Sequence, residues 1–219
     1  MEKPVGIPAG AVTLHGDLAL PERSQGIVLF AHGSGSSRMS PRNRQVARVL
    51  GDAGLATLLM DLLTADEESE DMRTGHLRFD IGFLAERLVA ATDWLTSSPA
   101  TCHLAIGYFG ASTGAGAALV AAAQRPSVVR TIVSRGGRPD LAGDALERVS
   151  APTLLIVGGY DRRVIDMNRD AMARMRAEVK IEIVPGASHL FEEPGTLEIV
   201  ARLARDWFRR HLLPVRSSA

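Results

Sequence analysis

Short apolar runs alternate with amphipathic stretches along most of this chain. Apolar runs with almost no polar interruption are typical of strands buried on both faces of a parallel sheet. We predict such strands at residues 26–31, 56–63, 103–108, 128–133, 152–157 and 179–184. Apolar positions at helical spacing predict intervening helices at residues 41–53, 79–95, 114–123, 141–149, 165–176 and 197–212.

The first 20 residues follow a different pattern. Residues 5–20 read as two short strands with a turn at 6–10 and no helix between them, which predicts an antiparallel edge. The fold class is therefore α/β, with a mostly parallel, doubly wound sheet, helices on both faces and an antiparallel N-terminal edge. We find no linker or internal repeat, and we predict a single domain over residues 1–219 with no large cap domain.

An acidic stretch interrupts the alternation at residues 64–78, where five carboxylates fall close together. The stretch is expected to be a solvated surface loop. A flap that covers the active site is the alternative interpretation.

Composition narrows the class of partners and the compartment. Lys plus Arg and Asp plus Glu both number 25, so the net charge is zero, which argues against a general nucleic-acid binder. No run of about 18 apolar residues is present, so we expect no membrane span. Residues 1–10 lack the apolar core of a signal peptide, and Cys102 is the single cysteine, expected to be inert packing. Together these features favour a cytoplasmic protein.

The strongest local motif is Gly110-Ala111-Ser112-Thr113-Gly114, which lies between a predicted strand and a predicted helix. This G-x-S-x-G pattern is typical of a sharp turn that exposes a serine hydroxyl above the end of a sheet. The glycines are needed because side chains two residues on either side would collide with the strand or the helix. We therefore predict Ser112 as a nucleophile.

A serine hydroxyl needs a base and an acid partner, and two later strand ends supply candidates. Asp161 follows the strand at 152–157, and His189 follows the strand at 179–184. An oxyanion hole is predicted from the N–H groups of Thr113 and Ser34, because Ser34 lies in a glycine-rich loop after an early strand. Asp161 could instead be a helix N-cap, with Asp166 and Asp170 as weaker acid candidates.

Two arginines follow the strand after the serine turn and belong at the same rim of the sheet. Arg135 and Arg138 are predicted to hold a carboxylate or phosphate of the substrate, with an ordinary surface salt bridge as the alternative. His32 is expected to be structural, and His76 is expected to lie on the surface. No His and Cys cluster has metal-ligand spacing, so no metal or other cofactor is expected.

Taken together, the GASTG turn, HGSGSS after an early strand, GGYD after a late one and GASH near the end resemble the α/β-hydrolase fold, in its dienelactone-hydrolase-like branch. Dienelactone hydrolases proper carry a cysteine nucleophile, whereas this chain carries Ser112. The resemblance and the residues together imply a serine hydrolase that cleaves a carboxylic ester, thioester or lactone through an acyl-enzyme. Acyl transfer, amide hydrolysis and a binding protein without turnover are the alternatives. The expected partner is a small-molecule substrate, and the sequence leaves a homodimer open.

Overall fold

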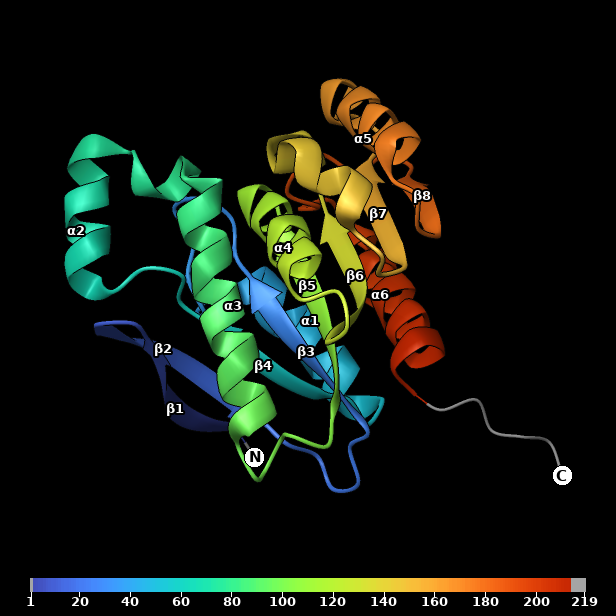
Figure 1. Ribbon diagram of the computed structural model, residues 1–219. Helices are drawn as coiled ribbons and strands as arrows, with labels where there is room; N and C mark the ends of the chain where they lie inside the picture. The colour runs from blue at the N-terminus through green and yellow to red at the C-terminus, as the bar shows by residue number, and fades with distance from the viewer. Residues whose placement is uncertain (1, 214–219) are drawn as a thin grey trace, which may run out of the picture.

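An eight-stranded sheet in the order β1-β2-β4-β3-β5-β6-β7-β8 forms the centre of the computed structural model, which describes residues 2–213 (Figure 1). β1 pairs antiparallel with β2, and β2 with β4, while all remaining pairs are parallel. The predicted parallel sheet with an antiparallel edge is confirmed. The strands are β1 (Glu2–Ala9), β2 (Val12–Ala19), β3 (Gly26–Ala31), β4 (Ala56–Met60), β5 (Ala105–Ala111), β6 (Val129–Arg135), β7 (Thr153–Gly158) and β8 (Val179–Val184).

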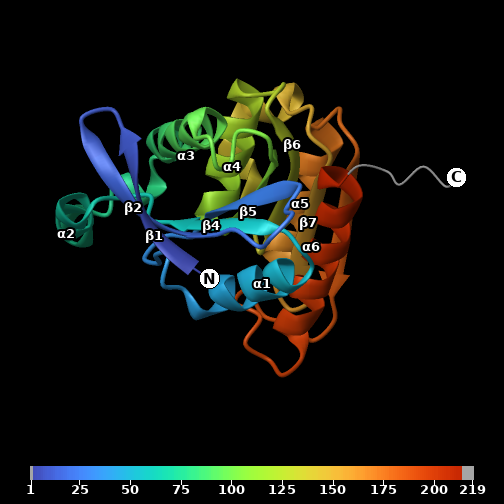
Figure 2. The same ribbon diagram turned by 90° about the horizontal axis from the view of Figure 1, so that it is seen from below.

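Helices cover both faces of the sheet, as Figure 2 shows from below. α1 (Pro41–Asp52) and α6 (Thr196–Leu212) lie on one face, and α3 (Ile81–Ser97), α4 (Thr113–Gln124) and α5 (Arg162–Arg174) on the other. Each face carries its own large apolar core. Among residues 2–213, no helix combines the length and apolar character that crossing a membrane requires.

The acidic stretch is not a loop, so that prediction was wrong. It folds into helix α2 (Ala65–Thr74), followed by the 3-10 turn η1 (Leu77–Phe79). Thr64 and Glu67 form a capping box at the start of α2, and Gly75 ends it in the left-handed conformation at a φ of 69°. The capping box satisfies the free N–H groups of the first turn, which offsets the low apolar content of the helix.

Three further expectations change in detail. Gly6 lies inside β1, and the turn follows at Gly10, where φ is 66°. The predicted helix at 141–149 is instead η2 (Pro139–Arg148), a 3-10 segment kinked at Gly143. Cys102 is exposed rather than packed, because it lies in the turn between α3 and β5.

The sheet register brings the loops that carry the site to one edge. Ala31 at the end of β3 pairs with Gly110 of β5, and Ala111 pairs with Arg135 of β6. Arg135 pairs in turn with Ile156 of β7. Because parallel strands end at the same edge, the loops after β3, β5, β6 and β7 meet there.

Candidate active site

Ser112 occupies a strained turn between β5 and α4. Its φ is 50° and its ψ is −122°, a region that a non-glycine residue rarely adopts. A Cβ added to Gly110 would lie 2.4 Å from Cα of Ala115, and one added to Gly114 would lie 2.4 Å from the carbonyl oxygen of Ala31. The turn can therefore form only because both flanking positions lack a side chain.

The predicted oxyanion donors lie next to Ser112. Thr113 is the first residue of α4, where an N–H group has no intrahelical acceptor. A Cβ at Gly33 would lie 3.1 Å from Cβ of Ser112, so the loop after β3 packs against the serine. The N–H of Ser34 donates to Oγ1 of Thr113 at 3.0 Å. This hydrogen bond joins the two predicted donors, and it occupies the Ser34 N–H in the free protein.

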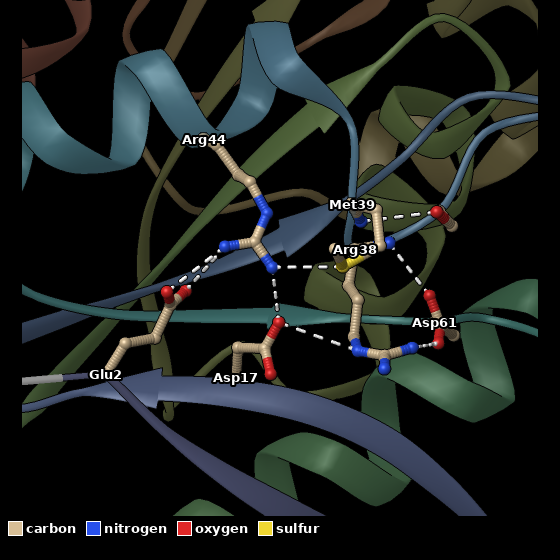
Figure 3. A network of polar contacts seen from close by, with 7 residues as sticks. Glu2, Asp17, Arg38, Met39, Arg44 and Asp61 are labelled. Atoms are coloured by element: carbon tan, nitrogen blue, oxygen red, sulfur yellow. Dashed lines mark hydrogen bonds and ion pairs between the residues drawn. The ribbon is translucent and has the colours of Figure 1, made fainter.

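A network of ion pairs fixes the segment that follows this loop (Figure 3). Arg38 pairs with Asp17 and Asp61, and its backbone N–H donates to Asp61 at 2.8 Å. Arg44 pairs with Asp17 at 2.6 Å and with Glu2 at 3.1 Å. The network therefore ties the oxyanion loop and α1 to the antiparallel edge hairpin and the end of β4.

His32 holds the same loop from inside. Its Nε2 accepts a hydrogen bond from the N–H of Leu62 at 3.0 Å, and its Nδ1 lies 2.9 Å from the carbonyl oxygen of Gly33. Burial lowers the pKa of His32, and the nearby carboxylates of Asp61 and Glu68 offset only part of that effect. His32 is thus a neutral bridge between the ends of β3 and β4, in keeping with a structural role.

Asp161 and His189 lie in contact after β7 and β8. Oδ2 of Asp161 is 2.6 Å from Nδ1 of His189. Asp161 stands at the N-cap position of α5, but its side chain makes no capping hydrogen bond. Its carboxylate is directed to the histidine instead, so the N-cap alternative does not describe it. Asp166, the weaker candidate, pairs with Arg169 on the surface.

Glu193 stabilises the loop that carries His189, and the sequence analysis did not identify it. Its Oε2 accepts a hydrogen bond from the N–H of Ser188 at 2.9 Å. That hydrogen bond is the largest of the causes that lower the pKa of Glu193. The buried Phe191 anchors the same loop, with a φ of 56°. Neither role has a local motif, because both depend on how the loop closes on itself.

The turn after β6 connects the serine to the histidine. The N–H of Ser112 donates to the carbonyl oxygen of Arg135 at 3.3 Å, and the N–H of Arg138 donates to that of Ser112 at 3.1 Å. A Cβ at Gly136 would lie 2.9 Å from the carbonyl oxygen of His189 and 3.6 Å from its Cε1. Ser112 and His189 are therefore both neighbours of residues 135–138.

The two arginines predicted for substrate have different surroundings. Arg138 is partly exposed and makes hydrogen bonds of 2.7 and 2.8 Å to Asp140, which matches the salt-bridge alternative. Arg135 is only 7% exposed, and its Nε and Nη1 have no hydrogen-bond partner within residues 2–213. Burial, with a smaller contribution from the charge of Arg42, lowers the pKa of Arg135 to about 10. The group stays charged at neutral pH, which makes it a buried cation with no counterion among the residues that the structure describes.

A cavity of about 280 Å³ lies next to the loop after β3 and to Thr113, the neighbour of Ser112, although Ser112 itself does not line it. Its walls come from the oxyanion loop, the end of β4, helices α2 and α3, and Thr113. Neither His189 nor any other residue of the β7–α5 and β8–α6 loops lines it. We call this space the α2 cavity. His76, by contrast, is exposed and contacts Thr74 at 2.7 Å, away from the lining.

Comparison with known proteins places the chain in a family. The family model for the dienelactone hydrolase family matches residues 14–212. A protein of Mycobacterium tuberculosis whose name proposes a phosphoribosyl transferase is 58% identical over 211 residues, which are 96% of this chain but 47% of that protein. The chain therefore spans about half the length of the curated relatives it matches.

Solved structures give the same result. A dienelactone hydrolase from Anabaena variabilis is 64% identical, with a TM-score of 0.96 over 97% of this chain and 98% of that one. Est1E from Butyrivibrio proteoclasticus shares the fold, with a TM-score of 0.79 over 94% of this chain and 98% of that one, at 15% identity. The family match extends over most of the chain and includes Ser112, Asp161 and His189. The chain belongs to the dienelactone hydrolase family.

Proposed function

We propose that the protein is a serine hydrolase that cleaves a carboxylic ester, thioester or lactone. The observation that carries this proposal is the 2.6 Å contact between Asp161 and His189. Ser112 is held in a strained turn, and both Ser112 and His189 neighbour residues 135–138. An aspartate bound to Nδ1 leaves Nε2 of the imidazole free to accept a proton. A purely structural Asp161 would cap the N-terminus of α5, but its side chain makes no capping hydrogen bond there.

In the first half of the reaction, Ser112 attacks the carbonyl carbon while His189 takes its proton. The tetrahedral oxyanion accepts hydrogen bonds from the N–H groups of Thr113 and Ser34. A charged oxygen is a stronger acceptor than a hydroxyl, so it displaces Oγ1 of Thr113 from the Ser34 N–H. His189 then protonates the leaving group, and the acyl group stays bound to Ser112.

In the second half, His189 removes a proton from water, and the resulting hydroxide attacks the acyl-enzyme. Ser112 regains its proton as the acid departs. Every proton passes through His189, so the chemistry needs no cofactor. Acyl transfer would follow the same path with an alcohol or amine in place of water, and an amide would place a greater demand on His189 as the acid.

We assign Arg135 to the leaving-group side of this site. The leaving group must lie against His189, and Gly136, the neighbour of Arg135, contacts that histidine. A buried guanidinium with free N–H groups suits a carboxylate or phosphate on the leaving group. Arg138 suits this role less well, because Asp140 already neutralises it.

Labelling with a fluorophosphonate tests the catalytic assignment. We expect Ser112 to carry the label in the wild-type protein, and His189→Ala to slow labelling by orders of magnitude. His76→Ala is the matched control, since His76 is exposed and outside the site. A wild-type protein without label on Ser112, or equal labelling in His189→Ala, would contradict the proposal. It would also favour the alternative of a binding protein.

Matched oxoester, thioester, lactone and amide substrates then separate the bond types. The phosphoribosyl transferase name belongs to a protein about twice as long, and no feature of this site supports carrying that activity over. A small-molecule substrate, a cytoplasmic location and a homodimer stay predictions, and light scattering of the purified protein tests the last.

A further inference from the structure

Helix α2 contributes little to the core, yet it is held firmly in place. Asp71 is its only buried residue, and Met72 is 71% exposed. Figures 1 and 2 show α2 standing at the edge of the molecule, away from the layers that cover the sheet. Glu67 pairs with Arg87 of α3, and Asp71 pairs with Arg78 of η1, both at 2.5 Å. Because ion pairs rather than apolar packing hold α2 in place, we look for its role in the cavity that it lines.

What α2 encloses is the α2 cavity, whose carboxylates differ in their bonding. Asp61 is paired with Arg38, and Asp71 is paired with Arg78. Glu68 also lines the cavity, and its N–H donates to the carbonyl oxygen of Thr64, but its carboxylate makes no hydrogen bond or ion pair within residues 2–213. Glu68 shares this lining with Ser34 and Thr113, the predicted oxyanion donors. Of the three carboxylates that line the cavity, Glu68 is therefore the one without a partner in the described part of the chain.

The position of the cavity identifies which half of an ester it would take. Ser34 and Thr113, whose N–H groups are the predicted oxyanion donors, both line the cavity, whereas Ser112 itself does not. A carbonyl oxygen bound by these two N–H groups would therefore lie at the opening of the cavity. The leaving group must lie against His189, which donates a proton to it. Since no residue of the His189 loop lines the cavity, the acyl group is the half that lies there.

We propose that the α2 cavity binds the acyl group of the substrate and that Glu68 selects acyl groups that donate a hydrogen bond. The inference rests on the serine hydrolase function proposed above. About 280 Å³ is at the small end of ligand pockets, so the acyl group is compact. Hydroxyl and ammonium groups close to the carbonyl share the required chemistry. The apolar floor formed by Leu62 and Leu84 accommodates the rest of the group.

The test uses three p-nitrophenyl esters of equal acyl size: propionate, 2-hydroxypropionate and 2-aminopropionate. The kcat/KM of each substituted ester is divided by that of propionate, in the wild type and in each variant. We expect Glu68→Ala to lower one or both ratios by about fivefold, the value of a partly exposed hydrogen bond to a charge. Glu70→Ala is the matched control, because Glu70 is exposed on the same helix and does not line the cavity.

Glu68→Gln separates the two sources of the hydrogen bond. The amide oxygen of Gln still accepts a hydrogen bond from a hydroxyl, but the amide no longer neutralises an ammonium. If the kcat/KM ratio in Glu68→Gln equals that of the wild type, the acyl substituent that binds Glu68 is a hydroxyl. If the ratio falls in both Glu68→Ala and Glu68→Gln, the substituent is an ammonium. If the ratios in Glu68→Ala equal those of the wild type, or if Glu70→Ala changes them as much, the cavity assignment is overturned.

The failures of the two proposals are distinguishable. A wild-type protein that hydrolyses none of the esters and takes no fluorophosphonate on Ser112 overturns the hydrolase function and the acyl pocket with it. A wild-type protein that hydrolyses the propionate ester, with ratios indifferent to Glu68, overturns the acyl pocket alone.

Discussion

The two sides of Ser112 are built on opposite electrostatic principles. On the α2 side, Asp61 and Asp71 are paired with arginines of the protein itself, and the charge left free is an exposed carboxylate. On the Arg135 side, the free charge is a buried guanidinium. On the α2 side, two of the three carboxylates are neutralised before a ligand binds and the third is solvated, whereas the Arg135 side holds a buried cation with no anion beside it among residues 2–213.

This difference implies a difference in selectivity. An exposed carboxylate gives up little hydration on binding, so its preference for one ligand over another is modest. A buried cation has already lost its hydration during folding, so an anion that reaches it gains most of the interaction. We therefore expect the leaving-group side to discriminate between substrates more strongly than the acyl side.

The largest effect on kcat should come from replacing Asp161, because Asp161 acts through His189 on every substrate. Asp161→Asn places an amide N–H against Nδ1 of His189, which favours the wrong tautomer. We expect kcat to fall by about 10⁴-fold, as for the corresponding change in other catalytic triads, with the same factor for every substrate. Steady-state kinetics on charged and neutral esters measure it. A loss that depends on the substrate would mean that Asp161 belongs to one side of the site.

Replacing Arg135 tests the contrast itself. In Arg135→Met, esters with an anionic leaving group should lose about 10- to 100-fold in kcat/KM, while neutral esters should change little. The same variant should be more stable, by about 1 kcal/mol or more, because a buried charge without a counterion is removed. Paired kinetic and thermal unfolding measurements record both effects.

Arg138→Met is the matched control, since Asp140 already pairs with Arg138 and the group is partly exposed. It should leave the ratio of anionic to neutral turnover unchanged. Equal losses for both ester classes in Arg135→Met, or a lower stability, would show that Arg135 serves the fold and not the substrate.

A smaller effect is expected from loosening α2. Burial alone raises the pKa of Asp71, but hydrogen bonds from Arg78 and Leu77 and the charge of Arg78 outweigh it, so the net pKa is lowered. The ionised carboxylate therefore stabilises α2 at pH values above about 4, and this contribution is lost as the pH falls through the lowered pKa. Asp71→Asn should mimic the loss at neutral pH.

Limited proteolysis with trypsin measures this loosening, because trypsin cleaves after arginine and Arg73 lies within α2. We expect faster cleavage after Arg73 in Asp71→Asn, together with weaker discrimination among acyl groups and unchanged discrimination among leaving groups. Asp66→Asn, an exposed change on the same helix, is the control. Unchanged cleavage and unchanged acyl preference would contradict the role given to the Asp71–Arg78 pair.

The contrast between the two sides also shows which features of the site can be predicted from the sequence. The order of strands and helices, the serine turn and the strand ends that carry Asp161 and His189 follow from local patterns, because apolar periodicity and glycine spacing are local properties. Helix α2 differs from this rule, because its capping residues Thr64 and Glu67 are visible in the sequence, while the high charge density that follows them is typical of a solvated loop.

Other features lie beyond any local pattern. Arg135 and Arg138 look alike in the sequence, and only folding shows that Asp140 neutralises one while burial isolates the other. The free state of Glu68 depends likewise on which carboxylates in the cavity find arginines. The burial of Arg135 arises from long-range packing, and even the partner of Arg138, which lies only two residues away, is set by the local conformation rather than by a motif.

The smallest expected effect concerns Glu193, which lies behind His189 and belongs to neither side. The N–H of Ser188 is the largest cause that lowers the pKa of Glu193, so the carboxylate holds this loop best when ionised. Glu193→Ala should lower kcat by about threefold and leave KM unchanged, while Glu193→Gln, which keeps an acceptor oxygen, should lower it less. The ratio of wild-type to Glu193→Ala kcat should be constant above about pH 4.3 and should approach one as the pH falls through the lowered pKa. Anionic and neutral esters should lose equally, and a greater loss for anionic leaving groups would instead place the His189 loop on the Arg135 side of the site.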